Sequence, residues 1–272
     1  MLLNVIGNRW LSVCDYEKSY DRLSVDYNQN WLVHLHKVTD DLLDMLPEQV
    51  DGDILDIGCG TGYTTRFLEN KYSENRIVAA DISSGMLAQA RQECKRTELV
   101  HQDMLEFLAG QEDVSAGLIV SGWAIGYSTP RKIIAEASRV LKSGGVLAFV
   151  VNYADTMQPV FYAFRHTMAR FPDKVLKALN PKYPVDYPEL EKMLNLSGFE
   201  YQYCREGRIL IEGRECGSRK LEWLLNTGVL AGFDKVLPLQ DNDEVAEFFE
   251  IKMNECEKPM EHHYIIYLGT KR

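Results

Sequence analysis

The sequence predicts an α/β fold built on a doubly wound, mostly parallel sheet. Short apolar segments of strand length alternate with segments of helical periodicity over residues 54–152, a pattern that implies parallel strands joined by helices. A glycine-rich turn follows the first of these strands, at the edge where such sheets bind their ligands. The 272 residues, of which 46% are hydrophobic, suffice to bury a large core around this sheet.

The N-terminal part is predicted to be helical. Apolar and aromatic residues recur every three or four positions within 16–45, and Pro47 together with the Asp51-Gly52 turn ends this pattern. The run 54–57 (Ile-Leu-Asp-Ile) is short, apolar and closed by glycines, which is typical of a buried strand. A helix is expected over 63–71.

Strands and helices then alternate as far as residue 152. A helix over 84–94 begins at a serine N-cap, Ser83 or Ser84, and a helix over 131–141 ends before Lys142 and Gly144. The expected strands are 76–80, 98–101, 118–121 and 145–152.

The pattern changes after Asn152. Residues 154–187 are helical in period but contain four prolines, which indicates an inserted, broken helical cap. The remaining expected elements are helices over 189–197, 218–237 and 243–256, and strands over 201–211 and 263–268.

Composition and charge narrow the functional classes. The net charge of −10 disfavours a nucleic-acid binder, which normally carries a basic surface. No apolar run is long enough to span a bilayer, and the N-terminal residues lack the basic segment and cleavage site of a signal peptide. The six scattered cysteines form no C-x-x-C pair, and strand alternation would separate His262 from His263. We therefore expect a reduced, cytoplasmic protein without a metal site.

The most informative segment is the glycine-rich turn. Its glycines fall as Gly58-x-Gly60-x-Gly62, and they permit positive φ angles and close approach of a ligand to the backbone. The helix that follows offers free N–H groups. The dinucleotide fingerprint G-x-G-x-x-G would place its third glycine where this chain has Tyr63, so the spacing disfavours a nicotinamide-dependent oxidoreductase.

Asp56, two residues before the first glycine, completes a motif that resembles motif I of the class I S-adenosylmethionine (SAM)-dependent methyltransferases. Asp81 after the second strand and Asp103 after the third resemble the acids that this family directs at the ribose hydroxyls and the adenine amino group. The runs 118–123 and 139–145 follow in the family's order and spacing.

One position departs from the family. Many members have an aspartate at the start of the fourth strand, whereas this chain has Gly117. We therefore assign no contact with the SAM ammonium group to an acid there, and expect Ser121 and backbone carbonyls to serve the methionine part.

The resemblance implies a seven-stranded, Rossmann-like sheet that binds SAM and releases S-adenosylhomocysteine (SAH). Residues 1–50 would form a helical lid, 51–153 the SAM-binding core, and 154–187 a helical cap. Residues 188–272 would complete the core sheet and carry a helical insertion near 218–256. We expect these additions to surround one cleft rather than to form a second domain.

The resemblance also implies a set of cofactor contacts in the lid, the glycine loop and the strand ends. These residues are Tyr20, Tyr27, Asp56, Gly58, Cys59, Gly60, Gly62, Asp81, Ile82, Met86, Asp103, Met104 and Ser121.

Methyl transfer from a sulfonium is an in-line displacement, so the protein must mainly align the nucleophile with the methyl group and exclude water. No catalytic residue is assigned. Three histidines are candidate general bases as well as ordinary core or surface residues: His34, His36 and His166. The residues expected to contact the methyl acceptor are Trp31, Trp123, Tyr127, Asn152 and Tyr153.

The predicted function is transfer of a methyl group from SAM to an oxygen, nitrogen or carbon atom of a small molecule. A carrier-bound acyl group, a protein or tRNA are alternative acceptors. The run from Ser121 to Ala124 differs, however, from the Pro-Pro-aromatic motif of amino-methylating nucleic-acid enzymes, and no Pro-Cys pair is present. A SAM-binding protein without turnover is the remaining alternative, and the oligomeric state is left open.

Overall fold

The computed structural model describes residues 10–211 and 220–272. Two compact units are present, and each is assembled from three separate parts of the chain. The first unit comprises Met1–Trp31, Asp155–Asn180 and Arg208–His263, and the second comprises Leu32–Ala154, Pro181–Gly207 and Tyr264–Arg272. Parts of the N-terminal segment, the cap and the C-terminal insertion therefore share one unit. The expected division into lid, core, cap and insertion stays a prediction.

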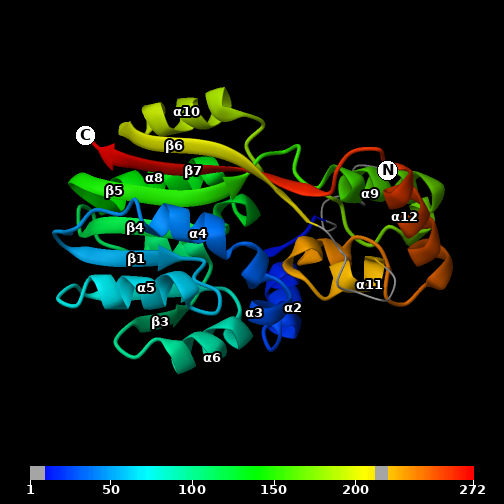
Figure 1. The fold of residues 1–272 in the computed structure, drawn as a ribbon, viewed down its shortest axis with the longest axis horizontal. Helices are drawn as coiled ribbons and strands as arrows, with labels where there is room; N and C mark the ends of the chain where they lie inside the picture. Colours follow the sequence, from blue (N-terminus) through cyan, green and yellow to red (C-terminus); the bar gives the residue numbers. More distant parts are fainter. Residues whose placement is uncertain (1–9, 212–219) are drawn as a thin grey trace. The chain divides into compact units, whose positions relative to one another are not determined.

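The sheet has seven strands in the order β3-β2-β1-β4-β5-β7-β6, with β1 at the switch in strand order (Figure 1). Strands β1 to β5 pair in parallel, and β7 runs antiparallel to β5. This confirms the predicted doubly wound, mostly parallel sheet. The strands are β1 (Asp53–Ile57), β2 (Ile77–Asp81), β3 (Glu98–His101), β4 (Ala116–Gly122), β5 (Leu141–Asn152), β6 (Phe199–Leu210) and β7 (Glu261–Lys271).

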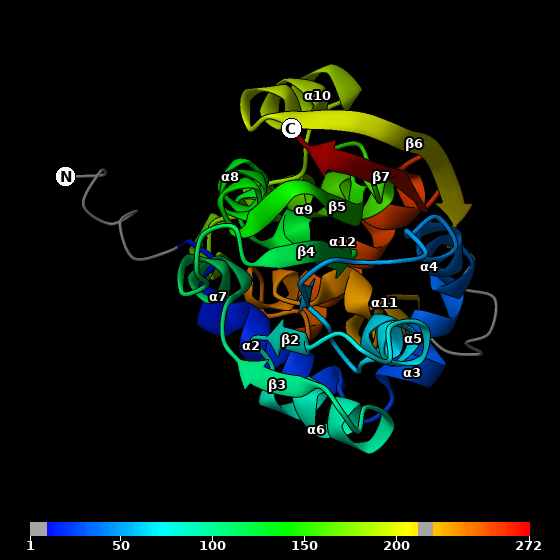
Figure 2. The same ribbon diagram turned by 90° about the vertical axis from the view of Figure 1, so that its left-hand side faces the viewer.

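Two groups of helices accompany the sheet. Figure 2 shows α4 and α5 on one face and α7 and α8 on the other. Helix α6 packs beside α5, and α10 packs beside α8. The helices are α4 (His36–Leu43), α5 (Tyr63–Lys71), α6 (Ser84–Glu93), α7 (Met104–Ala109), α8 (Pro130–Val140) and α10 (Tyr187–Leu196). Sequence patterns predicted α5, α6, α8 and α10 to within two residues but missed α7, which is too short to show a periodic signal.

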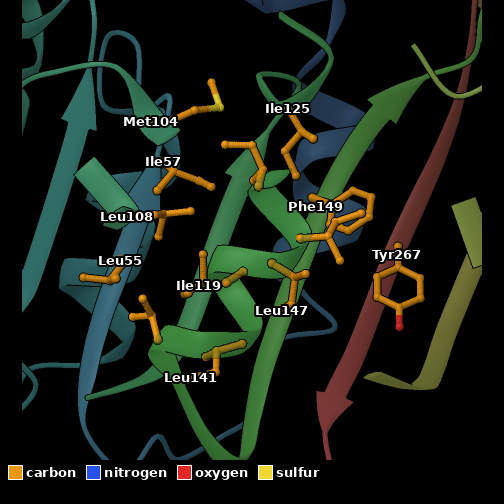
Figure 3. Close-up of a cluster of buried hydrophobic side chains, with 14 of the residues drawn as sticks. Leu55, Ile57, Met104, Leu108, Ile119, Ile125, Leu141, Leu147, Phe149 and Tyr267 are labelled. Carbon is orange, nitrogen blue, oxygen red and sulfur yellow. The ribbon is translucent and has the colours of Figure 1, made fainter. Parts of the chain in front are cut away.

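The core of the second unit lies between the sheet and α7, α8 and α10. Alternate residues of the central strands point to this face, so that Leu55 and Ile57 of β1 lie beside Ile119 of β4 and Leu147 and Phe149 of β5 (Figure 3). All five side chains are buried. Burial of each such side chain is worth about 1.5–3 kcal/mol, which fixes the strand register and hence the position of the strand ends.

The first unit is helical. Its elements are α2 (Val13–Leu23), α3 (Tyr27–Asn30), α9 (Gln158–Arg170), α11 (Lys220–Leu225), α12 (Asp243–Glu255) and the 3₁₀ turns η3 (Pro172–Lys174), η4 (Gly228–Leu230) and η5 (Phe233–Lys235). Buried Asp234 links η5 to α2, because its carboxylate accepts a 2.6 Å hydrogen bond from Ser19 of α2 and pairs with Arg22 of α2 at 3.3 Å. No helix within residues 10–211 and 220–272 is long and apolar enough to cross a membrane.

Two predicted helices are wrong in extent. The helical pattern of 16–45 is divided among α2, α3, the 3₁₀ turn η1 (Leu32–His34) and α4, with the backbone leaving helical geometry at Trp31 (φ −134°). The helix predicted over 218–237 starts outside the described residues, and within them it is reduced to α11, η4 and η5. Gly228 and Gly232 interrupt it, since glycine disfavours a continuous helix.

A buried carboxyl group lies in the centre of β1. The side chain of Asp56 is fully buried, and its Oδ2 accepts a 2.6 Å hydrogen bond from the Thr65 hydroxyl of α5. Its Oδ1 has no hydrogen-bond partner among the described residues. Burial raises the pKa of Asp56 to about 7, with a smaller contribution from the Asp81 charge, and the Thr65 hydrogen bond acts in the opposite direction.

This raised pKa predicts how stability depends on pH. Folded protein holds the Asp56 proton more tightly than unfolded chain, so the stabilising contribution is present in acid and is lost as pH rises through about 7. Between pH 5 and 8, wild type should lose about 3 kcal/mol of unfolding free energy relative to Asp56→Asn. Urea denaturation of both proteins across this range measures the difference, and parallel pH curves would contradict the prediction.

Candidate functional site

The glycine loop lies at the carboxyl end of β1, next to the switch in strand order. Gly58, Gly60 and Gly62 have φ angles of +73°, +55° and +88°, as the sequence predicted from their spacing. The N–H groups of Gly58 and Cys59 donate to the Ala80 carbonyl at 2.8 and 3.1 Å, so the end of β2 holds the loop. A Cβ placed on Gly60 would meet no atom within 4 Å. The loop backbone therefore has open space beside it.

Asp81 joins this loop to the start of α6. Its Oδ2 accepts a 2.8 Å hydrogen bond from the Gly60 N–H, and its Oδ1 accepts a 2.9 Å hydrogen bond from the Ser83 N–H. A carboxylate is an acceptor with two oxygens, the kind of group that binds the two hydroxyls of a diol. The partly exposed Asp81 is thus both a support of the loop and the predicted ribose acceptor.

The residues expected near adenine surround the start of α7. Asp103 is the N-cap of this helix, with Oδ1 accepting from the N–H groups of Leu105 and Glu106 at 2.9 and 3.3 Å. Met104 is buried in the core, and the Ile82 carbonyl lies 2.7 Å from His101 Nε2. Capping fixes the direction of the Asp103 carboxylate, and its contact with adenine stays a prediction.

Several predicted cofactor residues are buried. Ser121 is fully buried, and its hydroxyl donates a 2.8 Å hydrogen bond to the Ile57 carbonyl. Cys59 is buried, and burial raises the pKa of its thiol. Met86 is buried in α6, where its N–H donates to the Ser83 N-cap side chain. The side chains of Ser121 and Asp56 bond to groups that flank the loop, and contacts of all these residues with SAM stay predictions.

Two residues expected at the acceptor side follow β4. Trp123 is partly exposed and has a φ of +71°, which is uncommon for an aromatic residue. Its ring packs edge-on against Tyr264 at 5.4 Å between centroids. Tyr127 is partly exposed and packs against Tyr183 at 6.5 Å. Aromatic rings therefore gather beyond the carboxyl ends of β4 and β5.

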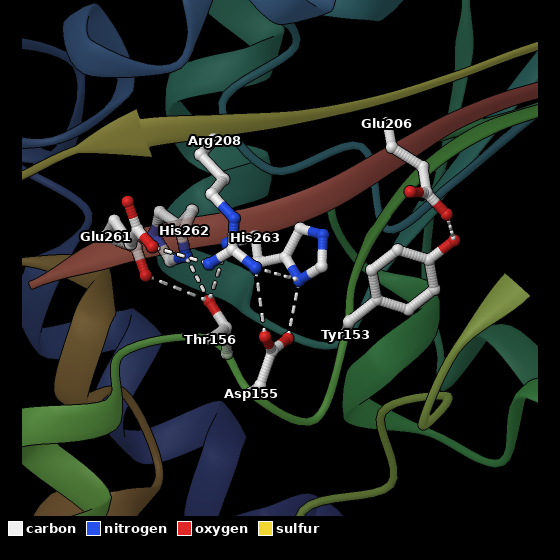
Figure 4. Close-up of polar contacts among 8 residues, drawn as sticks. All are labelled: Tyr153, Asp155, Thr156, Glu206, Arg208, Glu261, His262 and His263. Carbon is white, nitrogen blue, oxygen red and sulfur yellow. Dashed lines mark hydrogen bonds and ion pairs between the residues drawn. The ribbon is translucent and has the colours of Figure 1, made fainter. Parts of the chain in front are cut away.

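Two further acceptor candidates end β5. Asn152 is 7% exposed, and its Oδ1 has no hydrogen-bond partner among the described residues. Tyr153 is 1% exposed and donates a 2.7 Å hydrogen bond to Glu206 of β6 (Figure 4). A buried amide oxygen without a partner costs free energy, so Asn152 is a candidate for recognition of a ligand, whereas Tyr153 has a structural partner.

The predicted lid residues belong to the first unit. Tyr20 packs edge-on against Tyr27 at 6.1 Å, and buried Trp31 packs against Trp223 at 6.3 Å and His262 at 5.4 Å. Their expected roles against SAM and the acceptor stay predictions.

The histidine pair in β7 divides as strand alternation predicts. His262 is buried, with Nδ1 lying 3.1 Å from the Thr156 hydroxyl, and burial lowers its pKa to about 4. His263 instead lies 2.6 Å from Asp155, which also pairs with Arg208 (Figure 4). Among residues 10–211 and 220–272, no three or more His, Cys, Asp or Glu side chains are grouped to hold a metal ion.

The three candidate base histidines differ in setting. His36 stacks on Tyr63 at 4.2 Å, and burial lowers its pKa. His166 is exposed beside Tyr162, and His34 is partly exposed in η1. None is identified as a base by its contacts. Helix α4 lies within the helical pattern predicted over 16–45, but the sequence does not indicate that its Thr39 contacts Trp123 or that its Asp40 contacts Tyr63 at the start of α5.

Aromatic residues of the cap pack inside the first unit. Phe164 is buried against Phe249 at 4.8 Å, and Phe161 packs on Phe233 at 5.6 Å. The same unit has a surface hollow of about 810 Å³ between α11 and α12, lined partly by carboxylates. The cap aromatics do not line this hollow, so packing accounts for them.

Comparison with known proteins identifies the core. Residues 54–145 match the family model described as a methyltransferase domain. Malonyl-[acyl-carrier protein] O-methyltransferase of Hahella chejuensis is 35% identical over 120 residues, which cover 41% of this chain and 40% of that protein. Trans-aconitate 2-methyltransferase of Afipia carboxidovorans is 25% identical over 232 residues, covering 80% of this chain and 84% of that protein.

The fold has a counterpart among solved structures. The YcgJ protein of Bacillus subtilis superposes with a TM-score of 0.58 at 18% identity, covering 87% of this chain and 99% of that one. The chain spans about half the length of the first curated relatives it matches. Residues 54–145, which include the glycine loop, are therefore similar to a methyltransferase domain, and the seven-stranded sheet around them has the Rossmann-like fold of class I SAM-dependent methyltransferases.

Proposed function

We propose that this chain is an enzyme that transfers the methyl group of SAM to a small-molecule acceptor. The observation that carries the proposal is the glycine loop at the β1–β4 switch, held by the Asp81 carboxylate through the Gly60 N–H. Such a switch point is the ligand-binding position of open α/β sheets. The open space beside Gly60 and the carboxylate of Asp81 at the end of β2 fit the methionine and ribose parts of SAM.

Bound SAM would supply an electrophilic methyl group on a sulfonium. The residues of this chain would then mainly bind and orient the two reactants. Asp81 would accept hydrogen bonds from the ribose hydroxyls, and Asp103 would accept one from the adenine amino group. The Trp123 ring would line the acceptor side, where an aromatic face tolerates positive charge. Holding the nucleophile in line with the methyl group supplies much of the rate enhancement.

Two relatives guide the choice of acceptor. The names malonyl-[acyl-carrier protein] O-methyltransferase and trans-aconitate 2-methyltransferase both describe acceptors that carry carboxylates. A carboxylate oxygen needs no general base at neutral pH, in keeping with the absence of an assigned catalytic histidine. A carboxylate is therefore the first acceptor group to test, either free or on an acyl carrier protein.

We expect the protein to bind SAM and SAH but not NAD, and to form SAH when supplied with a suitable acceptor. Calorimetric titration with SAM, SAH and NAD measures the first expectation. Incubation with SAM and either trans-aconitate or malonyl-acyl carrier protein, followed by chromatography of SAH, measures the second. SAM binding without SAH formation from any acceptor would favour a binding protein, and NAD binding without SAM binding would refute the proposal.

Asp81→Ala should weaken SAM binding at least about tenfold while the protein stays folded, because it removes charge-assisted hydrogen bonds to the loop and to the ribose. The matched control is Asp51→Ala, whose exposed carboxylate lies before β1, away from the loop, and pairs with Lys142. Calorimetry and circular dichroism of both variants test this. Unchanged SAM affinity in folded Asp81→Ala would remove Asp81 from the cofactor site.

Asn152→Ala should act on the acceptor and spare the cofactor. Its unpartnered, buried Oδ1 is placed to accept a hydrogen bond from the acceptor, so its loss should raise KM about two- to tenfold and leave SAM affinity within twofold. Initial rates with trans-aconitate and malonyl-acyl carrier protein measure KM, with exposed Asn70→Ala of α5 as the control. An unaltered KM, or a parallel loss of SAM binding, would contradict this role.

A further inference from the structure

Helix α4 contacts three segments near the carboxyl edge of the sheet through three consecutive residues. Thr39 Oγ1 accepts a 3.1 Å hydrogen bond from the Trp123 indole N–H, which follows β4. Asp40 accepts a 2.6 Å hydrogen bond from the hydroxyl of Tyr63, the first residue of α5 after the glycine loop. Asp41 pairs with Arg205 of β6. All these residues belong to the second unit.

The Thr39 hydroxyl is fixed in its orientation. Its side chain is buried, at 2% exposure, and the same oxygen donates a 3.1 Å hydrogen bond to the Leu35 carbonyl one turn earlier. A hydroxyl has one donor and two acceptor positions, so using the proton on Leu35 leaves the lone pairs for Trp123. Thr39 is therefore an acceptor of defined direction for the indole.

Trp123 is held in an uncommon backbone conformation. Its φ of +71° is unfavourable for a non-glycine residue and persists only where surrounding contacts impose it. Its N–H donates to the Val150 carbonyl at 3.1 Å, its ring packs on Tyr264, and its indole donates to Thr39. The Thr39 hydrogen bond is one of the contacts that oppose relaxation of this strain.

The next residue lies against the glycine loop. A Cβ built on Gly58 would be 2.2 Å from the Cβ of Ala124, so Ala124 occupies the space that a side chain at position 58 would need. Relaxation of the Trp123 backbone would displace Ala124. Contacts therefore run without a break from Thr39 through Trp123 and Ala124 to Gly58.

We propose that Thr39 is a positioning residue: its hydroxyl holds Trp123 in the strained conformation that presses Ala124 onto the glycine loop, and so keeps the loop ready for the cofactor. The inference rests on the proposed function, since it takes SAM and SAH as the ligands of that loop. It assigns to α4 a role in cofactor affinity that requires no contact with the cofactor.

The test compares Thr39→Val, which removes the hydroxyl at nearly constant shape, with Thr39→Ser, which keeps it. Trp123→Phe removes the indole N–H from the other side, and the double variant Thr39→Val/Trp123→Phe completes a cycle. SAH is the probe, and calorimetry of the full chain gives its Kd. Circular dichroism and the Tm report whether each variant is folded.

Thr39→Val should raise the SAH Kd about two- to tenfold, the range expected for loss of one hydrogen bond, and Thr39→Ser should stay within twofold of wild type. Trp123→Phe should raise the SAH Kd by a similar factor. The double variant should bind SAH no more weakly than the weaker-binding single variant, because all three variants lack the same hydrogen bond. The indole N–H resonance of Trp123 in ¹⁵N-labelled protein is identified by its absence from Trp123→Phe. Addition of SAH should shift this resonance in wild type and in Thr39→Ser.

Three results would overturn the inference: wild-type SAH affinity in folded Thr39→Val, failure of Thr39→Ser to restore affinity, or additive effects of the two single changes. If Thr39→Val does not fold, Trp123→Phe and Thr39→Ser decide the question, and wild-type affinity in Trp123→Phe overturns the inference. If the wild type itself binds neither SAM nor SAH, the proposed function fails. If the wild type binds SAH and substitutions at position 39 do not change the Kd, only the role of Thr39 is refuted.

Discussion

The site depends on the hydrogen bond between the Asp81 carboxylate and the Gly60 N–H. The glycine loop must allow a ligand to approach its backbone closely, yet a loop with three positive φ angles has many other conformations available to it. Asp81 limits this freedom because one carboxylate binds the loop and the first turn before α6 at once. The parallel pairing of β1 with β2 brings the two segments together, so the sheet register determines whether this contact can form.

Buried polar groups further restrict the conformation of the loop, although their burial is itself unfavourable. Asp56 is bonded to Thr65, and Ser121 is bonded to the Ile57 carbonyl, so β1 is tied to α5 and to β4 directly below the glycines. Burying the Asp56 carboxyl is unfavourable, as its raised pKa indicates, and the hydrophobic residues of β1, β4 and β5 offset that cost. A buried polar group that is retained in this way gives the loop one defined position rather than greater stability.

The sequence predicts features that depend on neighbouring residues better than features that depend on contacts between residues far apart in the chain. The glycines, Asp81 and Asp103 belong to short motifs that follow predicted strands. Their position at one edge of the sheet can therefore be inferred from the sequence alone. Helix α7 was missed because six residues show no period, and the helical pattern of 16–45 did not reveal that Trp31 leaves helical geometry. The gathering of three distant segments into the first unit is a tertiary effect with no local signal. The same holds for Thr39, which has an ordinary helical neighbourhood in sequence and meets Trp123 only through the fold.

The two sides of the site are therefore specified differently. The proposed cofactor side consists of backbone groups and carboxylates at strand ends, which the sheet alone can position, and the family match covers that part of the chain. The proposed acceptor side includes Trp123, whose ring depends on contacts with Thr39 of α4 and Tyr264 of β7. Substitutions in these outer elements can reshape the acceptor side while β1 and its loop stay fixed. A similar cofactor core is thus compatible with relatives whose names describe different acceptors. Asn152 lies at the end of β5, where the sheet meets the proposed acceptor side, and its buried Oδ1 has no hydrogen-bond partner among the described residues.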